Sequence, residues 1–128
     1  MDPMTADFTA VFGALRPVLA KHEEHMIVKS DTPEGYSLDS KVPSVFPQHK
    51  GGALFFGAIR IGKGYVSFHL MPVYMCADLE AKITPALKRR MQGKSCFNFR
   101  TVPDAGLLSD LQELTDASVA AWQQRKWL

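Results

Sequence analysis

The sequence predicts an α+β domain of two layers, in which an antiparallel sheet of about four strands carries N- and C-terminal helices on one face. Two patterns predict this fold class. Apolar runs on both sides of Gly62-Lys63-Gly64 are typical of a β-hairpin with a short glycine-containing loop. The segments near both ends of the chain repeat apolar residues every three or four positions, as amphipathic helices do. We therefore expect the order helix, three strands, helix, strand, helix.

The N-terminal helix is predicted from an apolar stripe. Thr5 or Asp7 can cap its start. Pro17 predicts a kink or a restart near Arg16, because proline cannot donate a helical hydrogen bond. The stripe consists of Phe8, Val11, Phe12, Leu15, Leu19 and His22. We expect Phe12 in particular to be deeply buried.

Four segments have the composition of β-strands. After a turn over residues 30–35, residues 36–41 alternate weakly between apolar and polar side chains and form the first strand. The hairpin strands cover about residues 53–61 and 65–71, and the last strand covers residues 95–100. Prolines between the first strand and the hairpin interrupt regular structure. We expect the hairpin to lie at the centre of the sheet.

Two further helices follow the hairpin. Thr84 followed by Pro85 has the signature of a helix start. Gly93 stands where a left-handed residue would end that helix, so a helix is predicted over residues 85–92, after a shorter helical turn. Asp104 can cap the final helix. The apolar face of the final helix consists of Leu107, Leu111, Leu114, Ser118, Ala121 and Trp122.

Length and composition narrow the class of protein. The 128 residues, 46% of them hydrophobic and 22% charged, are expected to form one domain over residues 1–128. A net charge of +2 is too mild to indicate nucleic acid as the partner. Neither a signal peptide nor a membrane-spanning stretch is visible. Cys76 and Cys96 match no CxxC pattern, so we expect reduced thiols and a cytoplasmic location.

One segment has the spacing of a phosphate-binding loop but lacks the residue and the helix that should follow it. Residues 57–63 have the spacing G-x-x-x-x-G-K of a nucleotide-binding loop. That chemistry needs Ser or Thr next and then a helix, but here Gly64 and a strand follow. The glycines therefore serve the hairpin, and the sequence predicts no cofactor.

Several phrases of the chain resemble the YdhG-like family of small bacterial domains. The residues that carry the resemblance are Lys41-Val-Pro-Ser-Val-Phe46, Gly57-Ala-Ile, Tyr65-Val-Ser-Phe-His69 followed by Met71, and Gly93-Lys-Ser-Cys-Phe-Asn-Phe99. The resemblance covers residues 33–122 and departs from the family pattern at Pro72, since the family tends to place proline before this methionine. It implies an architecture shared with type III secretion chaperones and YjbR-like proteins, but no biochemical function.

One face of the predicted sheet is a candidate ligand or partner surface. Alternation along the second hairpin strand places Tyr65, Ser67 and His69 on the face opposite the helices. Asn98 and Arg100 on the last strand belong to the same face. A half-covered sheet of this composition suits a small ligand, a protein partner or a second subunit, and a solvated antiparallel face is the alternative.

A basic cluster is a candidate anion site. Lys88 and Arg89 stand near the end of the predicted helix, and Lys94 follows it. Cations there also complement the helix dipole, which explains them without a ligand. Anion or nucleic-acid binding through this helix end is therefore kept as an alternative function.

Metal binding has three candidate sets, one of which is His22 and His25, whose imidazoles stand at positions i and i+3. Asp110, Glu113 and Asp116 form an acidic stripe on the final helix. Some YdhG-like members have been proposed as frataxin-like iron carriers, so the resemblance offers an iron-carrier role for this stripe. His69 and Cys96 could approach across the sheet, although their spacing in sequence does not show it.

The sequence contains no motif for nucleophilic catalysis, because neither cysteine has a basic neighbour along the chain. We therefore expect a non-catalytic binding or assembly module rather than an enzyme. A homodimer that uses the open face or a sheet edge is a further expectation, because unpaired strand edges must be covered or paired.

Overall fold

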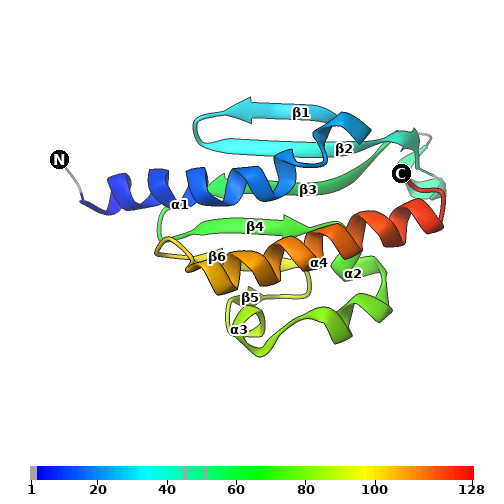
Figure 1. Cartoon of the computed structure of the whole chain (residues 1–128). Helices are drawn as coiled ribbons and strands as arrows, with labels where there is room; N and C mark the ends of the chain where they lie inside the picture. Colours follow the sequence, from blue (N-terminus) through cyan, green and yellow to red (C-terminus); the bar gives the residue numbers. More distant parts are fainter. Residues whose placement is uncertain (1–2, 45, 51) are drawn as a thin grey trace.

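The computed structural model describes residues 3–44, 46–50 and 52–128, and shows one antiparallel sheet packed against two long helices (Figure 1). The long helices are α1, Pro3–Ala20, and α4, Ala105–Gln124. The sheet has six strands in the order β1-β2-β3-β4-β6-β5. The strands are β1, Met26–Thr32; β2, Gly35–Pro43; β3, Ala53–Ile61; β4, Val66–Leu70; β5, Met91–Gln92; and β6, Cys96–Phe99.

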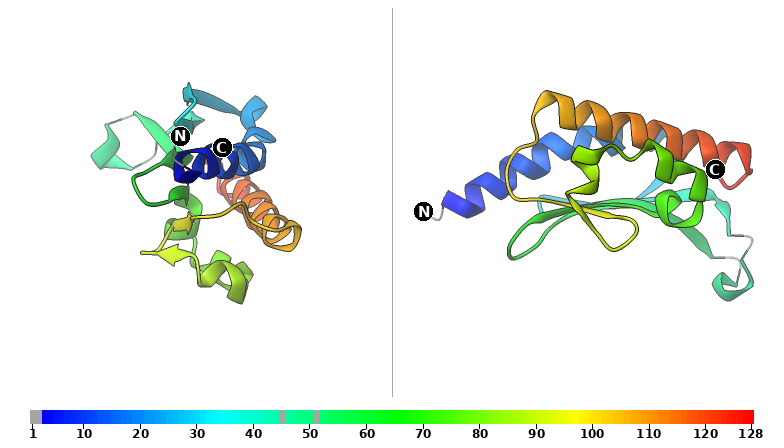
Figure 2. Two further views of the ribbon diagram at one scale, coloured as in Figure 1. Left: turned by 90° about the vertical axis from the view of Figure 1, so that its left-hand side faces the viewer. Right: turned by 90° about the horizontal axis from the view of Figure 1, so that it is seen from below.

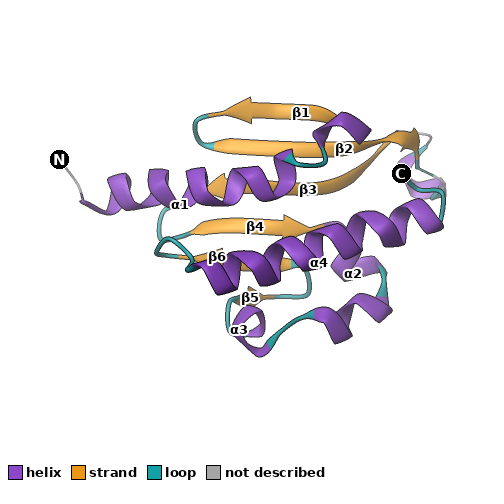
Figure 3. Ribbon diagram, in the orientation of Figure 1, coloured by secondary structure: helices purple, strands orange, loops and turns teal. Residues whose placement is uncertain are grey.

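Both long helices lie on the same face of the sheet. Figure 2 shows the sheet edge-on, with α1 and α4 on one side of it. Three short helical segments lie near the β5 edge (Figure 3): α2, Met71–Met75; η3, Ala77–Lys82; and α3, Pro85–Lys88. Over the described residues, no helix covers the opposite face. The predicted two-layer α+β architecture is therefore confirmed.

The hairpin is central, as predicted. β3 and β4 are the third and fourth strands of the sheet, and their register pairs Gly57 with Leu70 and Ile61 with Val66. The backbone N–H of Gly62 donates to the carbonyl oxygen of Tyr65 (2.8 Å) and closes the loop. In the described sheet, β2 and β1 follow β3 on one side of the hairpin, and β6 and β5 follow β4 on the other.

The core lies between the sheet and the two helices. Trp122 and Phe12 are 0% and 6% exposed, as their helical stripes predict. The ring of Trp122 meets Phe56 of β3 edge-on, with ring centroids 5.4 Å apart. The whole predicted apolar face of α4 is buried. Of the helices in the described ranges, none is both long and apolar enough to cross a bilayer.

The predicted strand count is wrong, because β1 and β5 were not predicted. β1 occupies residues 26–32, part of which the sequence assigned to a turn. Only Met26 of this edge strand is buried, so the strand has no alternation of apolar and polar side chains to predict it. β5 has two residues and exists through its pairing with β6, where Met91 lies opposite Phe97.

The helix predicted over residues 85–92 is also too long. Thr84 does cap α3, since its Oγ1 accepts from Leu87 N (3.3 Å), but the helix ends at Lys88. The carbonyl of Arg90 accepts from Asn98 N (2.8 Å), so sheet pairing replaces helical bonding. Gly93 has the expected left-handed backbone, with φ of +76°, but it serves the turn between β5 and β6.

The other boundary errors are small. α1 begins at Pro3, so the predicted cap positions, Thr5 and Asp7, lie inside the helix and not before it. The helix does not restart at Pro17, and the carbonyl of Pro17 accepts from Lys21 N (3.1 Å). β4 ends at Leu70, one residue earlier than predicted, and α2 over Met71–Met75 was not predicted. Asp104 caps α4 as predicted, through its Oδ1 and Leu107 N (2.8 Å).

Candidate functional site: the open face of the sheet

Alternation divides the central strands into a covered and an uncovered face. Val66, Phe68 and Leu70 of β4 are buried under the helices, whereas Ser67 and His69 are half-buried on the other side. β6 repeats this pattern, with its two phenylalanines buried and Cys96 and Asn98 half-buried. We call the uncovered side the open face. Its residues on the strands are Ser37, Asp39, Phe55, Ala58, Arg60, Ser67, His69, Cys96 and Asn98.

The strand register arranges these side chains in rows. Ala58, His69 and Cys96 are cross-strand partners on β3, β4 and β6. The neighbouring row consists of Arg60, Ser67 and Asn98. Direct cross-strand partners have Cβ atoms about 5 Å apart, so residues of one row can contact each other or one ligand.

The most unusual contact on the open face joins His69 to Cys96. His69 Nδ1 lies 2.9 Å from Cys96 Sγ, and His69 Nε2 lies 3.0 Å from Ser95 Oγ. The ring of Phe55 meets the imidazole edge-on, with centroids 5.4 Å apart. Both ring nitrogens therefore have partners, and the imidazole is held in one orientation.

Burial keeps the thiol and the imidazole uncharged. It lowers the pKa of His69 below its ordinary value and raises the pKa of the Cys96 thiol. The two separations fit the tautomer in which the thiol S–H donates to Nδ1 and Nε2–H donates to Ser95 Oγ, and also the tautomer in which Nδ1–H donates to Sγ and the Ser95 hydroxyl donates to Nε2. The result is a neutral chain of thiol, imidazole and hydroxyl, in which His69 of β4 lies between Cys96, the first residue of β6, and Ser95, which precedes it.

Two grooves adjoin on the open face. The central groove has a volume of about 560 Å³, and its lining includes Lys29, Asp39, Phe55, Arg60, Ser67 and His69. The edge groove has a volume of about 340 Å³ and is lined by Tyr65, Arg89, Arg90, Met91, Gln92, Asn98 and Arg100. The two meet at Ser67 and Asn98, which are direct cross-strand partners. Together they form one polar surface across the sheet.

The predicted ligand face therefore divides between the two grooves. Ser67 and His69 line the central groove, and Tyr65, Asn98 and Arg100 line the edge groove. Asn98 Nδ2 already donates to Gln92 Oε1 (2.6 Å) and is held in place by β5.

The predicted basic cluster is split. Arg89 joins Arg100 at the edge groove. Lys88 and Lys94 line a separate groove beside α2, where Lys94 Nζ lies 5.9 Å from the ring centroid of Tyr74. The helix end therefore does not gather its cations into one anion site.

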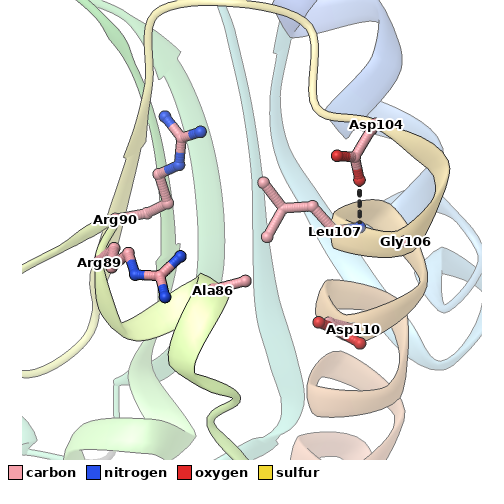
Figure 4. Close-up of a pocket in the computed structure, with 7 residues that line it drawn as sticks. All are labelled: Ala86, Arg89, Arg90, Asp104, Gly106, Leu107 and Asp110. Carbon is pink, nitrogen blue, oxygen red and sulfur yellow. Dashed lines mark hydrogen bonds between the residues drawn. The ribbon is translucent and has the colours of Figure 1, made fainter.

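A further groove lies between α3 and the start of α4 (Figure 4). Arg89 and Arg90 face Asp104 and Asp110 across it. The Asp104 carboxylate caps α4, and Asp110 Oδ2 accepts from Thr84 Oγ1 (3.0 Å). Two cations and two carboxylates balance, so the charge of this groove favours neither anions nor cations.

The acidic residues of α4 have other partners or face solvent. Asp116 accepts hydrogen bonds from Lys21 (2.9 Å), His22 (2.7 Å) and Gln112 (2.9 Å), and Glu113 is exposed. Among the described residues, no three His, Cys, Asp or Glu side chains lie close enough together to hold a metal ion. The iron-carrier alternative thus has no geometric support in the described ranges.

Sequence reasoning missed most of the central groove. It gave the approach of His69 and Cys96 only as an option, and it did not select Ser95, Phe55 or Arg60 at all. The alternation of side chains along each strand predicts that both His69 and Cys96 lie on the open face. What was missing was the register between β4 and β6, which depends on contacts distant in sequence.

Comparison of the chain with protein-family models, with curated proteins and with solved structures finds no match. The resemblance to the YdhG-like family therefore stays a prediction. The function has to be argued from the open face itself.

Proposed function

We propose that this protein is a binding domain that holds a small anionic ligand on the open face of its sheet. The observation that carries the proposal is the charge of the two adjoining grooves. Their cations are Lys29, Arg60, Arg89, Arg90 and Arg100, and among their described lining residues Asp39 is the one carboxylate.

The carboxylate does not neutralise this surface. Asp39 is buried, and its Oδ2 lies 3.7 Å from Lys29 Nζ, so these two charges cancel each other. Arg89 and Arg90 also face Asp104 and Asp110 across the neighbouring groove, so Arg60 and Arg100 are the arginines left without a carboxylate partner among the described lining residues. Arginine is well suited to carboxylates and phosphates, because its planar guanidinium donates two parallel hydrogen bonds.

The floor of the grooves supports the same ligand class. Ser67 and Asn98 supply hydrogen-bonding groups where the grooves meet, and Phe55 and Tyr65 supply aromatic surface. Ligand sites commonly combine such apolar surface with a few placed polar groups. A ligand with one or two anionic groups and a short organic body fits this arrangement.

Pyrophosphate titration followed by NMR of backbone amides tests the proposal. We expect shifts confined to the residues that line the two grooves and their neighbours. The affinity should be at least about tenfold lower in the Arg60→Ala, Arg100→Ala double variant, since the loss of even one charge-assisted hydrogen bond costs about 1.5–3 kcal/mol.

The matched control is the Lys88→Ala, Lys94→Ala double variant, which removes the same charge from the other basic groove. Its affinity should stay unchanged. If the lysine variant loses binding and the arginine variant keeps it, the site is the helix end instead. Equal losses would mean that only net charge matters, and the proposal would then be wrong.

A further inference from the structure

We propose that Cys96 is a nucleophilic thiol on the open face, that His69 is its general base, and that the pair reacts with small anionic disulfides. This goes beyond the proposed binding function and departs from the expectation of a non-catalytic module. Only the preference for an anionic disulfide rests on the proposed function, since the thiol chemistry depends on Cys96 and His69 alone.

The geometry is that of an activated nucleophile. Such sites place the nucleophile within hydrogen-bond reach of a base, and a third group orients the base. Cys96 Sγ, His69 Nδ1 and Ser95 Oγ meet these conditions, with separations of 2.9 Å and 3.0 Å on the two sides of the imidazole. Ser95 acts through His69 and is a positioning residue.

Access is suited to a small reactant. His69 lines the central groove, so a reactant in that groove lies against the imidazole. Cys96 is half-buried beside the groove, with Sγ 2.9 Å from Nδ1 of the same imidazole. Cys76, in contrast, is 1% exposed and lies in the core. The chain thus offers one accessible thiol and one buried thiol among its described residues.

The proposed step is thiol–disulfide exchange. The Cys96 proton passes to His69 Nδ1 while Sγ bonds to the nearer sulfur of the disulfide. The S–S bond of the reactant breaks, and the leaving sulfur carries its electron pair away and takes the proton back from His69. One disulfide and one protein thiol become one mixed disulfide and one small thiol, so atoms and electrons balance.

The surroundings favour a disulfide over a carbonyl compound. Attack on a carbonyl needs donors aimed at an oxyanion, commonly backbone N–H groups. β6 pairs with β4 on one side and with β5 on the other, and the carbonyl of Ser95 accepts from Leu70 N (2.9 Å). The backbone groups around Cys96 therefore already form hydrogen bonds within the sheet. Exchange between sulfurs develops charge only on sulfur and needs no such donors.

Two disulfides of different charge test the proposal on the whole chain. Oxidised glutathione is the anionic probe and 2-hydroxyethyl disulfide the neutral one, and intact-mass spectrometry follows the addition of one half-disulfide per chain. We expect Cys96 to react and Cys96→Ser to abolish the addition. Cys76→Ser is the matched control and should react as the wild type does.

The role of His69 is tested by rate. His69→Gln should slow the reaction at pH 7 by about 10²-fold, the lower end of what a positioned base contributes. The loss should shrink at high pH, where the thiol ionises without help. Ser95→Ala should change the rate less and move the midpoint of the pH profile.

The wild-type pH profile gives an independent readout that needs no variant at His69. If neutral His69 is the base, the rate should already level off near or below pH 6.5, the ordinary imidazole pKa. An unassisted thiol would instead gain rate up to pH 8.5 or above. The charged or titratable groups around the imidazole are Cys96 on β6, Asp39 on β2, Arg60 on β3 and Lys29 on β1.

The outcomes separate the two proposals. Addition at Cys96 from both probes at equal rates would support the thiol and overturn the anionic preference. Faster addition from oxidised glutathione would support both. No addition from either probe, or a profile that rises only with thiol ionisation, would overturn the thiol proposal and leave the pyrophosphate result to decide the binding function.

Discussion

Gly57 shows how a single residue sets the spacing of the central hairpin. A Cβ at this position would stand 2.8 Å from the carbonyl oxygen of His69, and 3.4 Å from the side chain of Leu19. The first of these atoms is backbone and cannot move aside without shifting β4. The side chain of His69 is the candidate base. The absence of a side chain at Gly57 therefore also sets the position of the strand that carries this base.

Gly57→Ala should therefore lower the free energy of unfolding by roughly 1–3 kcal/mol, the usual cost of overpacking. Urea denaturation measures it. The matched control is Gly13→Ala in α1, where no atom besides the neighbouring backbone of the helix itself lies within 4 Å of the new Cβ. Since alanine suits a helix interior better than glycine, that variant should gain about 0.5–1 kcal/mol. A neutral Gly57→Ala would show that β3 and β4 can separate freely.

At the scale of elements, the two long helices are joined by a polar network at the end of α1. Asp116 of α4 accepts from Lys21, His22 and Gln112. Burial by itself would raise the pKa of Asp116, but these hydrogen bonds outweigh it and hold the pKa below its ordinary value. The sequence placed Asp116 in an acidic stripe, whereas the packing of α1 against α4 gives it a structural role.

The lowered pKa of Asp116 fixes the sign of a pH effect. A carboxylate with a depressed folded-state pKa adds stability above its unfolded pKa of about 3.9, and this stability is lost as the pH falls through the folded pKa. Asp116→Asn should thus cost up to about 1 kcal/mol at pH 7, a modest value because the carboxylate is partly exposed.

The destabilisation by Asp116→Asn should fade in acid, and thermal unfolding from pH 7 down to pH 2 checks it. Glu113→Gln, an exposed carboxylate on the same helix, is the control and should show little effect at any pH. A loss for Asp116→Asn that is equal at pH 7 and pH 2 would contradict the electrostatic argument.

At the scale of the whole molecule, β1 forms a long edge of the sheet that pairs with no further strand among the described residues. β1 is the outermost strand, and its Ile27 and Val28 are 48% and 42% exposed. Such edges expose unpaired N–H and C=O groups and invite pairing with another strand. The predicted homodimer therefore has a specific candidate interface, in which two β1 strands pair antiparallel about a two-fold axis.

Light scattering at micromolar concentration tests this dimer. We expect twice the 14.2 kDa mass of one chain, and Ile27→Lys should restore the single-chain mass by placing a charge on the edge. Val102→Lys is the control, because Val102 is 50% exposed but precedes α4, away from β1. A wild-type mass of one chain would show that the edge stays unpaired.

The sequence alone determined the features that rest on neighbours along the chain. The hairpin loop at residues 62–64, the helix caps at Thr84 and Asp104, and the buried stripe ending at Trp122 all follow from local hydrogen bonding and from the 3.6- and 2-residue periods. These local signals are enough to assign the two layers and the side of the sheet on which the helices pack.

Only the tertiary structure decided what depends on partners distant in sequence. β1 and β5 carry no pattern of their own and form because β2 and β6 offer backbone partners. The approach of His69 to Cys96, 27 residues away, depends on the register between β4 and β6. Register is set by the packing of the whole sheet against its helices, so the candidate site emerges only once the chain is folded.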